Sequence, residues 1–212
     1  MKIKLNKKKP IVFPKKNQSI KSYVRDYLKL YSKVTDNIDQ NKVEKIKKMV
    51  VTTIKKNNQI FSAGNGGSAS ISNHLMCDYL KGVKLNSRYK IKPRVYSLSN
   101  SNELITAISN DENFDRVFVS QIENLSKRND LIIMFSCSGT SKNILKLINY
   151  ANKNKIRSIL FSGFLKTKLN VNINLNLNCK NYGICEDIFS SLMHSIMQSI
   201  VFEKYRKSKL RI

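Results

Sequence analysis

Two glycine- and serine-rich segments carry the clearest chemical signal in this chain of 212 residues. Residues 63–69 read AGNGGSA and residues 136–141 read SCSGTS; each follows a short apolar run and precedes a helical pattern. Glycine lets a backbone approach a ligand closely, and a helix N-terminus offers free N–H groups and the positive end of its dipole. The two segments therefore predict a binding site for an anion.

The residues in these segments favour a single phosphate group over a nucleotide. Neither segment matches the glycine patterns that bind triphosphates or dinucleotides. Hydroxyl groups at four positions add hydrogen-bond donors: Ser68, Ser136, Ser138 and Ser141. Turn formation alone would explain one such loop, but two loops at the ends of parallel strands favour a ligand. We expect this ligand to be a sugar phosphate.

His74 and His194 are the only histidines, and each has a carboxylate at a helical spacing. Asp78 follows His74 by four residues, so both side chains project from one helix face. Glu186 precedes His194 by eight residues, which is about 80° around a helix. Two imidazoles and two carboxylates could hold a divalent metal such as zinc. The same groups could instead act as general acid and base, and both interpretations stay open.

Alternating apolar runs and helical patterns indicate which elements position these residues. Strands are predicted at 60–63, 95–98, 131–135, 156–161 and 173–177, and helices at 68–80, 114–125, 141–152 and 188–205. Strands that alternate with helices form a parallel sheet covered on both faces. We therefore predict an α/β fold with a doubly wound parallel sheet, whose ligand lies beyond the carboxyl ends of the strands.

Two amphipathic patterns precede the first strand, within residues 19–57, and are separated by a break at 36–39. They predict an N-terminal helical hairpin that packs on the main domain or on a partner subunit. Residues 1–18 are basic and interrupted by two prolines. We therefore expect an N-terminal arm over 1–18 and a single domain over 19–212.

Composition excludes several classes of protein. The chain is 41% hydrophobic, and its longest apolar run is about five residues, so we expect neither a membrane span nor a signal peptide. Four cysteines without a CxxC motif indicate a reduced, cytoplasmic chain. The formal net charge is +25, but 31 of the 39 basic residues are scattered lysines. We interpret these lysines as solvated surface and expect no nucleic-acid partner.

The combination of motifs resembles the sugar isomerase (SIS) domain over about residues 20–205. The motifs are Gly64-Asn65-Gly66-Gly67-Ser68-Ala69, then His74, and Ser136-x-Ser138-Gly139-x-Ser141-x-Asn143. The spacing from Ser68 to His74 is similar to that of the phosphoheptose isomerase group. Two further segments, 107–111 and the Glu186-Asp187 pair ahead of His194, are also similar to that group.

The resemblance implies an aldose–ketose isomerase that converts sedoheptulose 7-phosphate to a heptose 7-phosphate for surface polysaccharide, either lipopolysaccharide or capsule. It also implies zinc as the metal and a homotetramer with sites built between subunits. The implied catalytic residues are Asp78 and His194, and the implied metal ligands are His74, Asp78, Glu186 and His194. The implied substrate-binding residues are Asn65, Gly66, Gly67, Ser68, Asp111, Ser136, Cys137, Ser138, Ser141 and Glu186.

This chain departs from the group's pattern at five positions. Asp78 stands for glutamate, Glu186 for glutamine, Cys185 for isoleucine, and both Cys137 and Tyr182 for threonine. The Asp78 carboxylate reaches about 1.5 Å less far, which would cost on the order of 10²-fold in rate without a compensating backbone shift. Every changed position keeps a side chain that can bind a ligand, so we interpret the changes as a retuned site. The alternative is a non-catalytic SIS module that binds a sugar phosphate and regulates or bridges other proteins.

Overall fold

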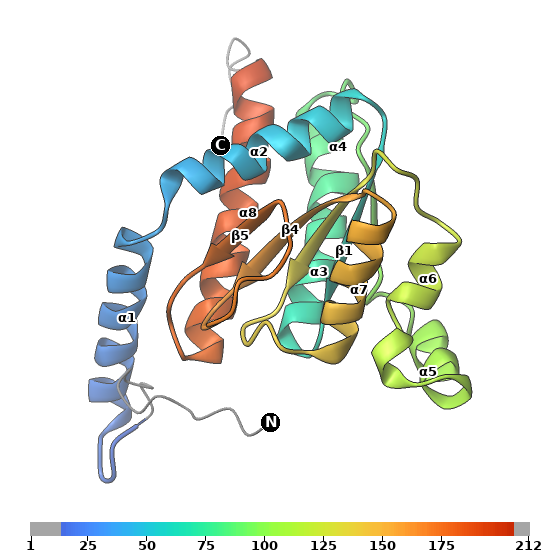
Figure 1. Cartoon of the computed structure of the whole chain (residues 1–212). Helices are drawn as coiled ribbons and strands as arrows, with labels where there is room; N and C mark the ends of the chain where they lie inside the picture. Colours follow the sequence, from blue (N-terminus) through green and yellow to red (C-terminus); the bar gives the residue numbers. More distant parts are fainter. Residues whose placement is uncertain (1–13, 206–212) are drawn as a thin grey trace.

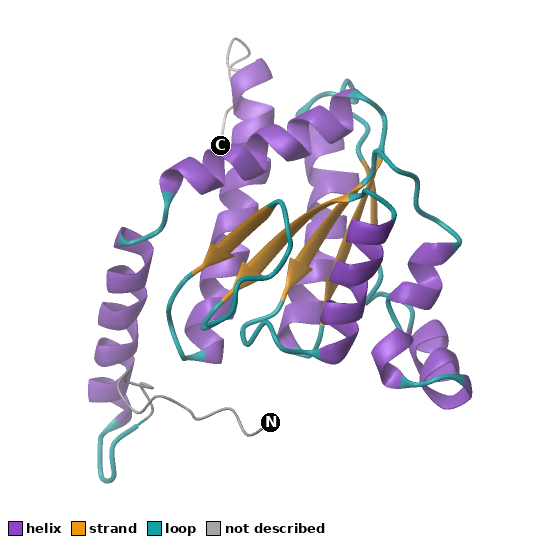
Figure 2. Ribbon diagram, viewed as in Figure 1, coloured by secondary structure: helices purple, strands orange, loops and turns teal. Residues whose placement is uncertain are grey.

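The computed structural model describes residues 14–205, and its centre is a five-stranded parallel sheet with helices on both faces (Figures 1 and 2). The strands are β1 (Gln59–Gly64), β2 (Arg94–Ser97), β3 (Leu131–Phe135), β4 (Arg157–Ser162) and β5 (Ile173–Asn176). Their order is β2-β1-β3-β4-β5, and every neighbouring pair is parallel. The predicted α/β fold is confirmed, and each predicted strand lies within one residue of the observed bounds.

Alternation along the strands divides the core into two layers. On β3, Ile133 and Phe135 face one layer, whereas Ile132 and Met134 face the other. Because successive strand residues point to opposite faces, an apolar run such as 131–135 must be covered on both sides. The layer with Ile133 packs against the helices over 40–55, 67–77 and 182–205, and the layer with Ile132 packs against the helices over 119–123 and 142–153.

The helices follow the predicted order with two additions, at 84–86 and 102–111, and the predicted helix over 114–125 is divided into a 3₁₀ turn and a shorter α-helix. They are α1 (Ile20–Asp36), α2 (Gln40–Lys55), α3 (Gly67–Cys77), a π-helical turn (Asp78–Val83), α4 (Lys84–Asn86), α5 (Asn102–Asp111), a 3₁₀ turn (Phe114–Arg116), α6 (Val119–Glu123), α7 (Lys142–Lys153) and α8 (Tyr182–Tyr205). Helix α5 was not predicted. Ser101 caps it by accepting a hydrogen bond from the Leu104 backbone N–H (3.3 Å). Helix α8 begins six residues before the predicted start.

The two predicted N-terminal helices are confirmed, and each packs on the main domain. In Figure 1 the chain bends between α1 and α2 and does not turn back on itself. Helix α1 lies beside α8, where the Tyr27 hydroxyl donates to Asp187 (2.6 Å) and the Tyr31 hydroxyl pairs with Ser191 (2.8 Å). Helix α2 buries Ile46 and Val50 against the sheet layer. Each amphipathic face therefore packs on the main domain and not on the other helix.

A chain of buried hydroxyl groups fixes α3 against the sheet. The Ser72 hydroxyl on α3 donates to the Ser62 hydroxyl on β1 (2.8 Å) and pairs with the Ser97 hydroxyl on β2 (2.7 Å). Ser97 in turn donates to the side chain of Asn73 (2.6 Å). All three serines are buried, so these hydrogen bonds are shielded from competing water.

The loops after β1 and β3 diverge at the centre of the sheet. The chain leaves β1 toward α3 in one layer and leaves β3 toward α7 in the other. Two adjacent strands whose connections leave to opposite faces open a crevice at their carboxyl ends, where ligands of open α/β sheets bind. The predicted anion loops lie on both sides of this crevice.

Two predictions concern the ends of the chain. Of the predicted arm 1–18, residues 1–13 lie outside the described residues, and 14–18 form an extended stretch with a turn ahead of α1. The division into an arm and one domain stays a prediction. Within residues 14–205, no helix is both long enough and apolar enough to cross a membrane.

Candidate functional site

A cavity of about 270 Å³ lies where β1 and β3 end. Nine of the predicted substrate-binding residues line it: Asn65, Gly66, Gly67, Ser68, Ser136, Cys137, Ser138, Ser141 and Glu186. Phe135 and Tyr182 line it as well, and neither was predicted as a site residue. The Tyr182 ring packs edge-on against Phe164 (5.4 Å between centroids) at the first position of α8. The cavity thus unites three segments that are far apart in the sequence.

Glycine is required where the first loop enters α3. Gly66, the N-cap residue, has a φ of +57°, a conformation that residues with a side chain rarely adopt. A Cβ at Gly67 would collide with the Glu186 carboxylate. These two residues let the first turn of α3 lie directly against the start of α8.

Serine hydroxyl groups accept backbone hydrogen bonds within the second loop, residues 136–141. The Gly139 backbone N–H donates to the carbonyl (3.0 Å) and hydroxyl (3.2 Å) oxygens of Ser136. The Thr140 N–H donates to the Ser138 hydroxyl (3.2 Å). Ser141 is the N-cap residue of α7, yet its side chain makes no capping hydrogen bond. The N-terminus of α7 therefore offers N–H groups and a free hydroxyl next to the cavity.

A reciprocal amide pair joins the two loops. The Asn65 side chain donates to Asn143 on α7 (2.9 Å), and Asn143 donates back to Asn65 (2.9 Å). Asn143 is buried and also accepts a hydrogen bond from the Ile144 N–H (2.9 Å). Asn65 is thus engaged in holding the cavity's two walls together.

Glu186 places a carboxylate in the wall of the cavity. Its Oε1 accepts a hydrogen bond from the Ser68 hydroxyl (3.2 Å) at the N-terminus of α3. Burial raises the pKa of this carboxyl above its ordinary value, although hydrogen bonds from Ser68 oppose the shift. The positive end of the α3 dipole is therefore already in contact with an acidic side chain.

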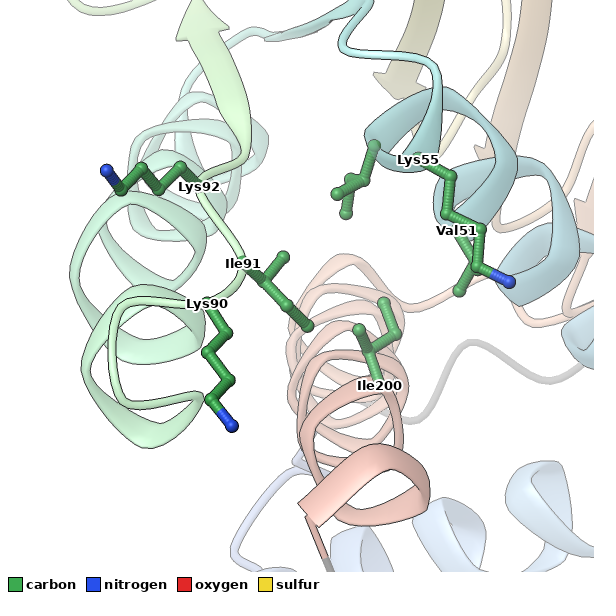
Figure 3. Close-up of a pocket in the computed structure, with 7 residues that line it drawn as sticks. Val51, Lys55, Lys90, Ile91, Lys92 and Ile200 are labelled. Carbon is green, nitrogen blue, oxygen red and sulfur yellow. The ribbon is translucent and has the colours of Figure 1, made fainter.

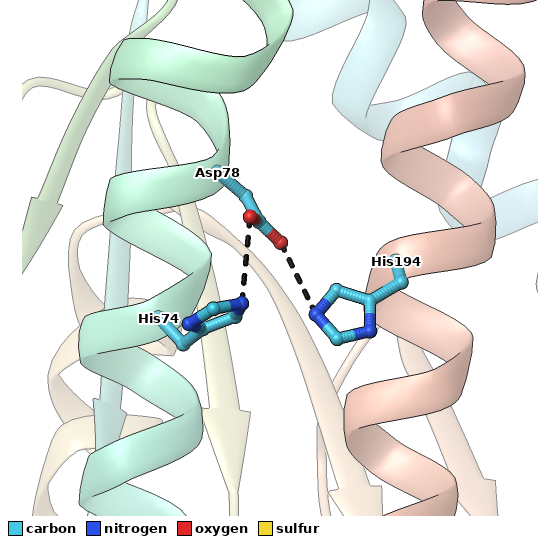
Figure 4. Close-up of side chains that lie close together, drawn as sticks. All are labelled: His74, Asp78 and His194. Carbon is cyan, nitrogen blue, oxygen red and sulfur yellow. Dashed lines mark ion pairs between the residues drawn. The ribbon is translucent and has the colours of Figure 1, made fainter. Parts of the chain in front are cut away.

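His74, Asp78 and His194 meet within one chain (Figure 4). The Nε2 atoms of His74 and His194 each lie 3.5 Å from an oxygen of Asp78, and the two rings are 5.0 Å apart. The Asp78 side chain, at the first residue of the π-helical turn, is 17% exposed, against 58% for His74 and 42% for His194. One ligand atom from each residue lies within 4.8 Å of the others. Two imidazole nitrogens and a carboxylate at this separation fit a divalent cation such as zinc.

Glu186 and Asp111 lie apart from this trio. Glu186 is eight residues ahead of His194 on α8, which corresponds to about 12 Å along the helix. Its carboxylate points to Ser68 and not to the histidines. Asp111 ends α5 on the surface and accepts a hydrogen bond from the Asn110 side chain (2.9 Å). In this chain it does not line the cavity.

The cavity and the trio lie at different positions along the same two helices, α3 and α8. Helices α3 and α8 are packed together, and both begin at the cavity. His74 is six residues beyond Ser68, a rise of about 9 Å. The arrangement therefore offers an anion site and a proton-transfer or metal site separated by about 9 to 12 Å.

A larger cavity of about 610 Å³ lies elsewhere (Figure 3). The residues that line it are Val51, Ile54, Lys55, Lys90, Ile91, Lys92 and Ile200. It lies close to the start of β2, at the amino ends of the strands. These described residues include no histidine, carboxylate or hydroxyl group, so acid–base chemistry is placed at the smaller cavity and the trio.

The comparison with known protein families decides the assignment. The family model described as "SIS domain" matches residues 22–163. The chain belongs to the SIS domain family. Relatives of this SIS protein include the phosphoheptose isomerase of Aliarcobacter butzleri, 35% identical over 134 residues, which are 62% of this chain and 68% of the relative. A second is the phosphoheptose isomerase of Helicobacter pylori (strain Shi470), 34% identical over 118 residues, which are 54% of this chain and 58% of the relative. The resemblance to phosphoheptose isomerases is confirmed, although the alignments leave about a third or more of each protein unmatched.

Solved structures confirm the SIS fold. The phosphoheptose isomerase of Neisseria gonorrhoeae superimposes with a TM-score of 0.73 at 19% identity, covering 85% of this chain and 96% of that one. The phosphoheptose isomerase of Francisella tularensis gives a TM-score of 0.74 at 19% identity, covering 87% and 96%. At these identities the likeness shows the fold, including the N-terminal helices.

Proposed function

We propose that this SIS protein is a phosphosugar isomerase that interconverts sedoheptulose 7-phosphate and a heptose 7-phosphate. One observation supports the proposal most strongly. The serine-lined cavity and the His74–Asp78–His194 trio both involve α3 and α8, and they are separated by about 9 to 12 Å along these helices. The relatives that are named phosphoheptose isomerases support the choice of substrate.

The phosphate end of the substrate belongs in the cavity. Ser136, Ser138 and Ser141 surround the start of α7, where N–H groups and the helix dipole stabilise an anion. With C–C bonds of about 1.5 Å, an extended chain of seven carbons spans about 8 Å and its phosphate ester bonds add about 2 Å, so the substrate reaches the trio at the lower end of the separation of about 9 to 12 Å. A phosphate held at one end thus presents the carbonyl carbon to the acid–base groups.

The trio supplies the proton transfers. Interconversion of a ketose and an aldose moves one proton between C1 and C2 and another between the two oxygens, through an enediol. Asp78 is the carboxylate between the histidines, so we assign it the carbon-bound proton, and we assign His194 the oxygen-bound proton. A divalent cation bound by His74, Asp78 and His194 would polarise the substrate carbonyl. We propose zinc as this cation.

Two broader expectations belong to the same proposal. A homotetramer would cover the exposed apolar residues of α1, Ile20, Val24 and Leu28. It would also bring Asp111 of one subunit toward a cavity of another, as expected for a site built between subunits. The product would enter the synthesis of activated heptose for surface polysaccharide.

The deciding experiment is turnover of sedoheptulose 7-phosphate by the full chain, with and without added zinc. We expect turnover that His194→Ala abolishes and that Lys55→Ala, in the remote cavity, leaves unchanged. Absence of turnover in the zinc-loaded protein would refute the proposal. Sugar-phosphate binding without turnover, unaffected by His194→Ala, would instead identify a regulatory SIS module.

A further inference from the structure

Three buried cysteines converge behind the wall of the cavity. Cys137 follows β3, Cys179 follows β5 and Cys185 lies in the first turn of α8; they are 3%, 5% and 0% exposed. Gly163, after β4, lies at their centre. A Cβ on Gly163 would be 2.5 Å from Cys185 Sγ, 3.1 Å from the Cys137 carbonyl oxygen and 3.2 Å from the Cys179 carbonyl oxygen. The absence of a side chain at residue 163 is what lets these cysteines approach one another.

Cys179 and Cys185 are held in direct contact. The Cys185 thiol donates a hydrogen bond to the Cys179 carbonyl oxygen (3.1 Å). The Cys179 N–H donates to the Gly163 carbonyl (2.8 Å), and the Cys185 N–H donates to Asn181 (3.0 Å). Hydrogen bonds therefore hold the backbone of Cys179 and the backbone of Cys185 in place beside each other, although the two residues are six positions apart in the sequence.

The two neighbouring thiols are chemically unequal. Hydrogen bonding from Cys185 lowers the pKa of the Cys179 thiol below its ordinary value. Contacts with Cys137 and Cys179, together with burial, raise the pKa of Cys185. A thiol of lowered pKa with a neighbouring protonated thiol is the arrangement in which the first sulfur reacts with an oxidant and the second resolves the product.

Cys179 is also the member of the pair with access to solvent. It lines a cavity of about 350 Å³ beside α1, which shares no lining residue with the 270 Å³ cavity. The lysines Lys33 and Lys180 line the same cavity. Cys185 lines neither cavity, and Cys137 lines only the 270 Å³ cavity. Within the pair, a small oxidant thus reaches Cys179 before it reaches Cys185.

We propose that Cys179 and Cys185 form an oxidation site that hydroperoxides convert to a disulfide. The Cys179 sulfur attacks one peroxide oxygen, the O–O bond breaks, and hydroxide leaves and takes up a proton to form water. The resulting sulfenic acid is attacked by the Cys185 sulfur, which loses its proton as the S–S bond forms and a second water leaves. Two thiols lose two electrons, and the peroxide gains them. This site is independent of isomerase activity.

Peptide mapping tests the proposal on the full chain. The protein is treated with hydrogen peroxide, its remaining thiols are alkylated, and it is digested with trypsin without reduction. Cleavage after Lys180 separates the two cysteines, so we expect a cross-link between peptides 169–180 and 181–204 that dithiothreitol releases. Exposed Cys77, in peptide 57–81, reports oxidation of an accessible thiol outside the cluster. The cross-link should form about tenfold faster than Cys77 is oxidised.

Two variants make the result decisive. Cys137→Ser should keep the cross-link, and Cys179→Ser should abolish it. A dominant cross-link between peptides 129–142 and 181–204 would assign the reaction to Cys137 and overturn the proposal. Oxidation of Cys77 without any cross-link, in either the unmodified protein or Cys137→Ser, would also overturn it.

Discussion

Replacing Glu186 by glutamine removes one negative charge from the wall of the 270 Å³ cavity proposed to bind phosphate and keeps the size of the side chain. The carboxylate accepts a hydrogen bond from Ser68, whose hydroxyl also lines the cavity. A phosphate bound at this hydroxyl would face Glu186 directly. We expect Glu186→Gln to bind phosphate and sugar phosphates more tightly than the unmodified protein.

The geometry gives the size of the effect. The Glu186 oxygen lies 3.2 Å from the Ser68 hydroxyl oxygen. A phosphate oxygen would lie about 2.8 Å beyond that hydroxyl, so the two charges would be about 6 Å apart. At this distance the repulsion is about 1 to 3 kcal/mol per unit of phosphate charge, for effective dielectric constants of about 80 to 20. The expected gain in affinity is therefore about five- to a hundred-fold, with the lower end favoured because Glu186 is only half-buried.

Protonation of Glu186 provides a second signature. Burial raises the pKa of its carboxyl above the unfolded value, so the folded protein holds this proton more tightly. The group's contribution to stability is thus lost as pH rises from the unfolded pKa through the raised one. The affinity difference between the two proteins should vanish at low pH, where Glu186 is neutral, and grow as pH rises through its raised pKa. Stability curves should show the same pH-dependent loss only in the unmodified protein.

Titration calorimetry with inorganic phosphate, between about pH 4 and pH 8, measures the effect. Asp187→Asn is the matched control, because it removes the same charge from the adjacent, exposed position. Divalent-metal affinity should be unchanged in Glu186→Gln, since Glu186 lies outside the trio. Weaker phosphate binding in Glu186→Gln, or a tenfold loss of metal affinity, would refute this reasoning.

Three further changes probe other parts of the molecule. Asp78→Asn removes the only carboxylate of the trio, and equilibrium dialysis should show at least about a tenfold loss of zinc affinity; unchanged affinity would contradict the assignment. Tyr27→Phe removes the hydrogen bond from α1 to Asp187 and should lower the free energy of unfolding by about 1 kcal/mol in urea titrations. Gly163→Ala places a Cβ 2.5 Å from Cys185 Sγ and should cost about 1 to 3 kcal/mol of stability. Cys185→Ala should restore part of that loss, and a double variant no more stable than Gly163→Ala alone would show that the strain lies elsewhere.

The sheet could be predicted from the sequence because its strands are short apolar runs between turns. Residues 131–135 are buried throughout, and their bounds match the prediction. Helix α5 escaped prediction because it is only ten residues long, so its apolar positions Leu104, Ile105 and Ile108 are too few to form a clear periodic pattern. The N-terminal helices could be predicted from their amphipathicity, which shows that a helix has a buried side but not which element covers that side.

The candidate site was predictable to a similar degree. Helical spacing placed His74 beside Asp78, and the two glycine-rich loops do line the cavity. Spacing could not show that α3 and α8 bring His194 to the same point, because that depends on packing between distant segments. The cysteine cluster gave no local signal either, since Cys137 and Cys185 meet only through the close approach at Gly163.

The serine hydrogen bonds that fix α3 to the sheet have a consequence for selectivity. Apolar packing tolerates small shifts of a helix, whereas the hydrogen bonds that join Ser72 to the hydroxyls of Ser62 and Ser97 hold over only a few tenths of an ångström. They therefore prevent α3 from sliding along β1 and fix the level of His74 relative to the loop that begins the helix. The distance between the cavity and the trio is therefore fixed. If a phosphate binds in the cavity, only a sugar chain of matching length reaches the trio, and shorter sugar phosphates would bind without reaching it.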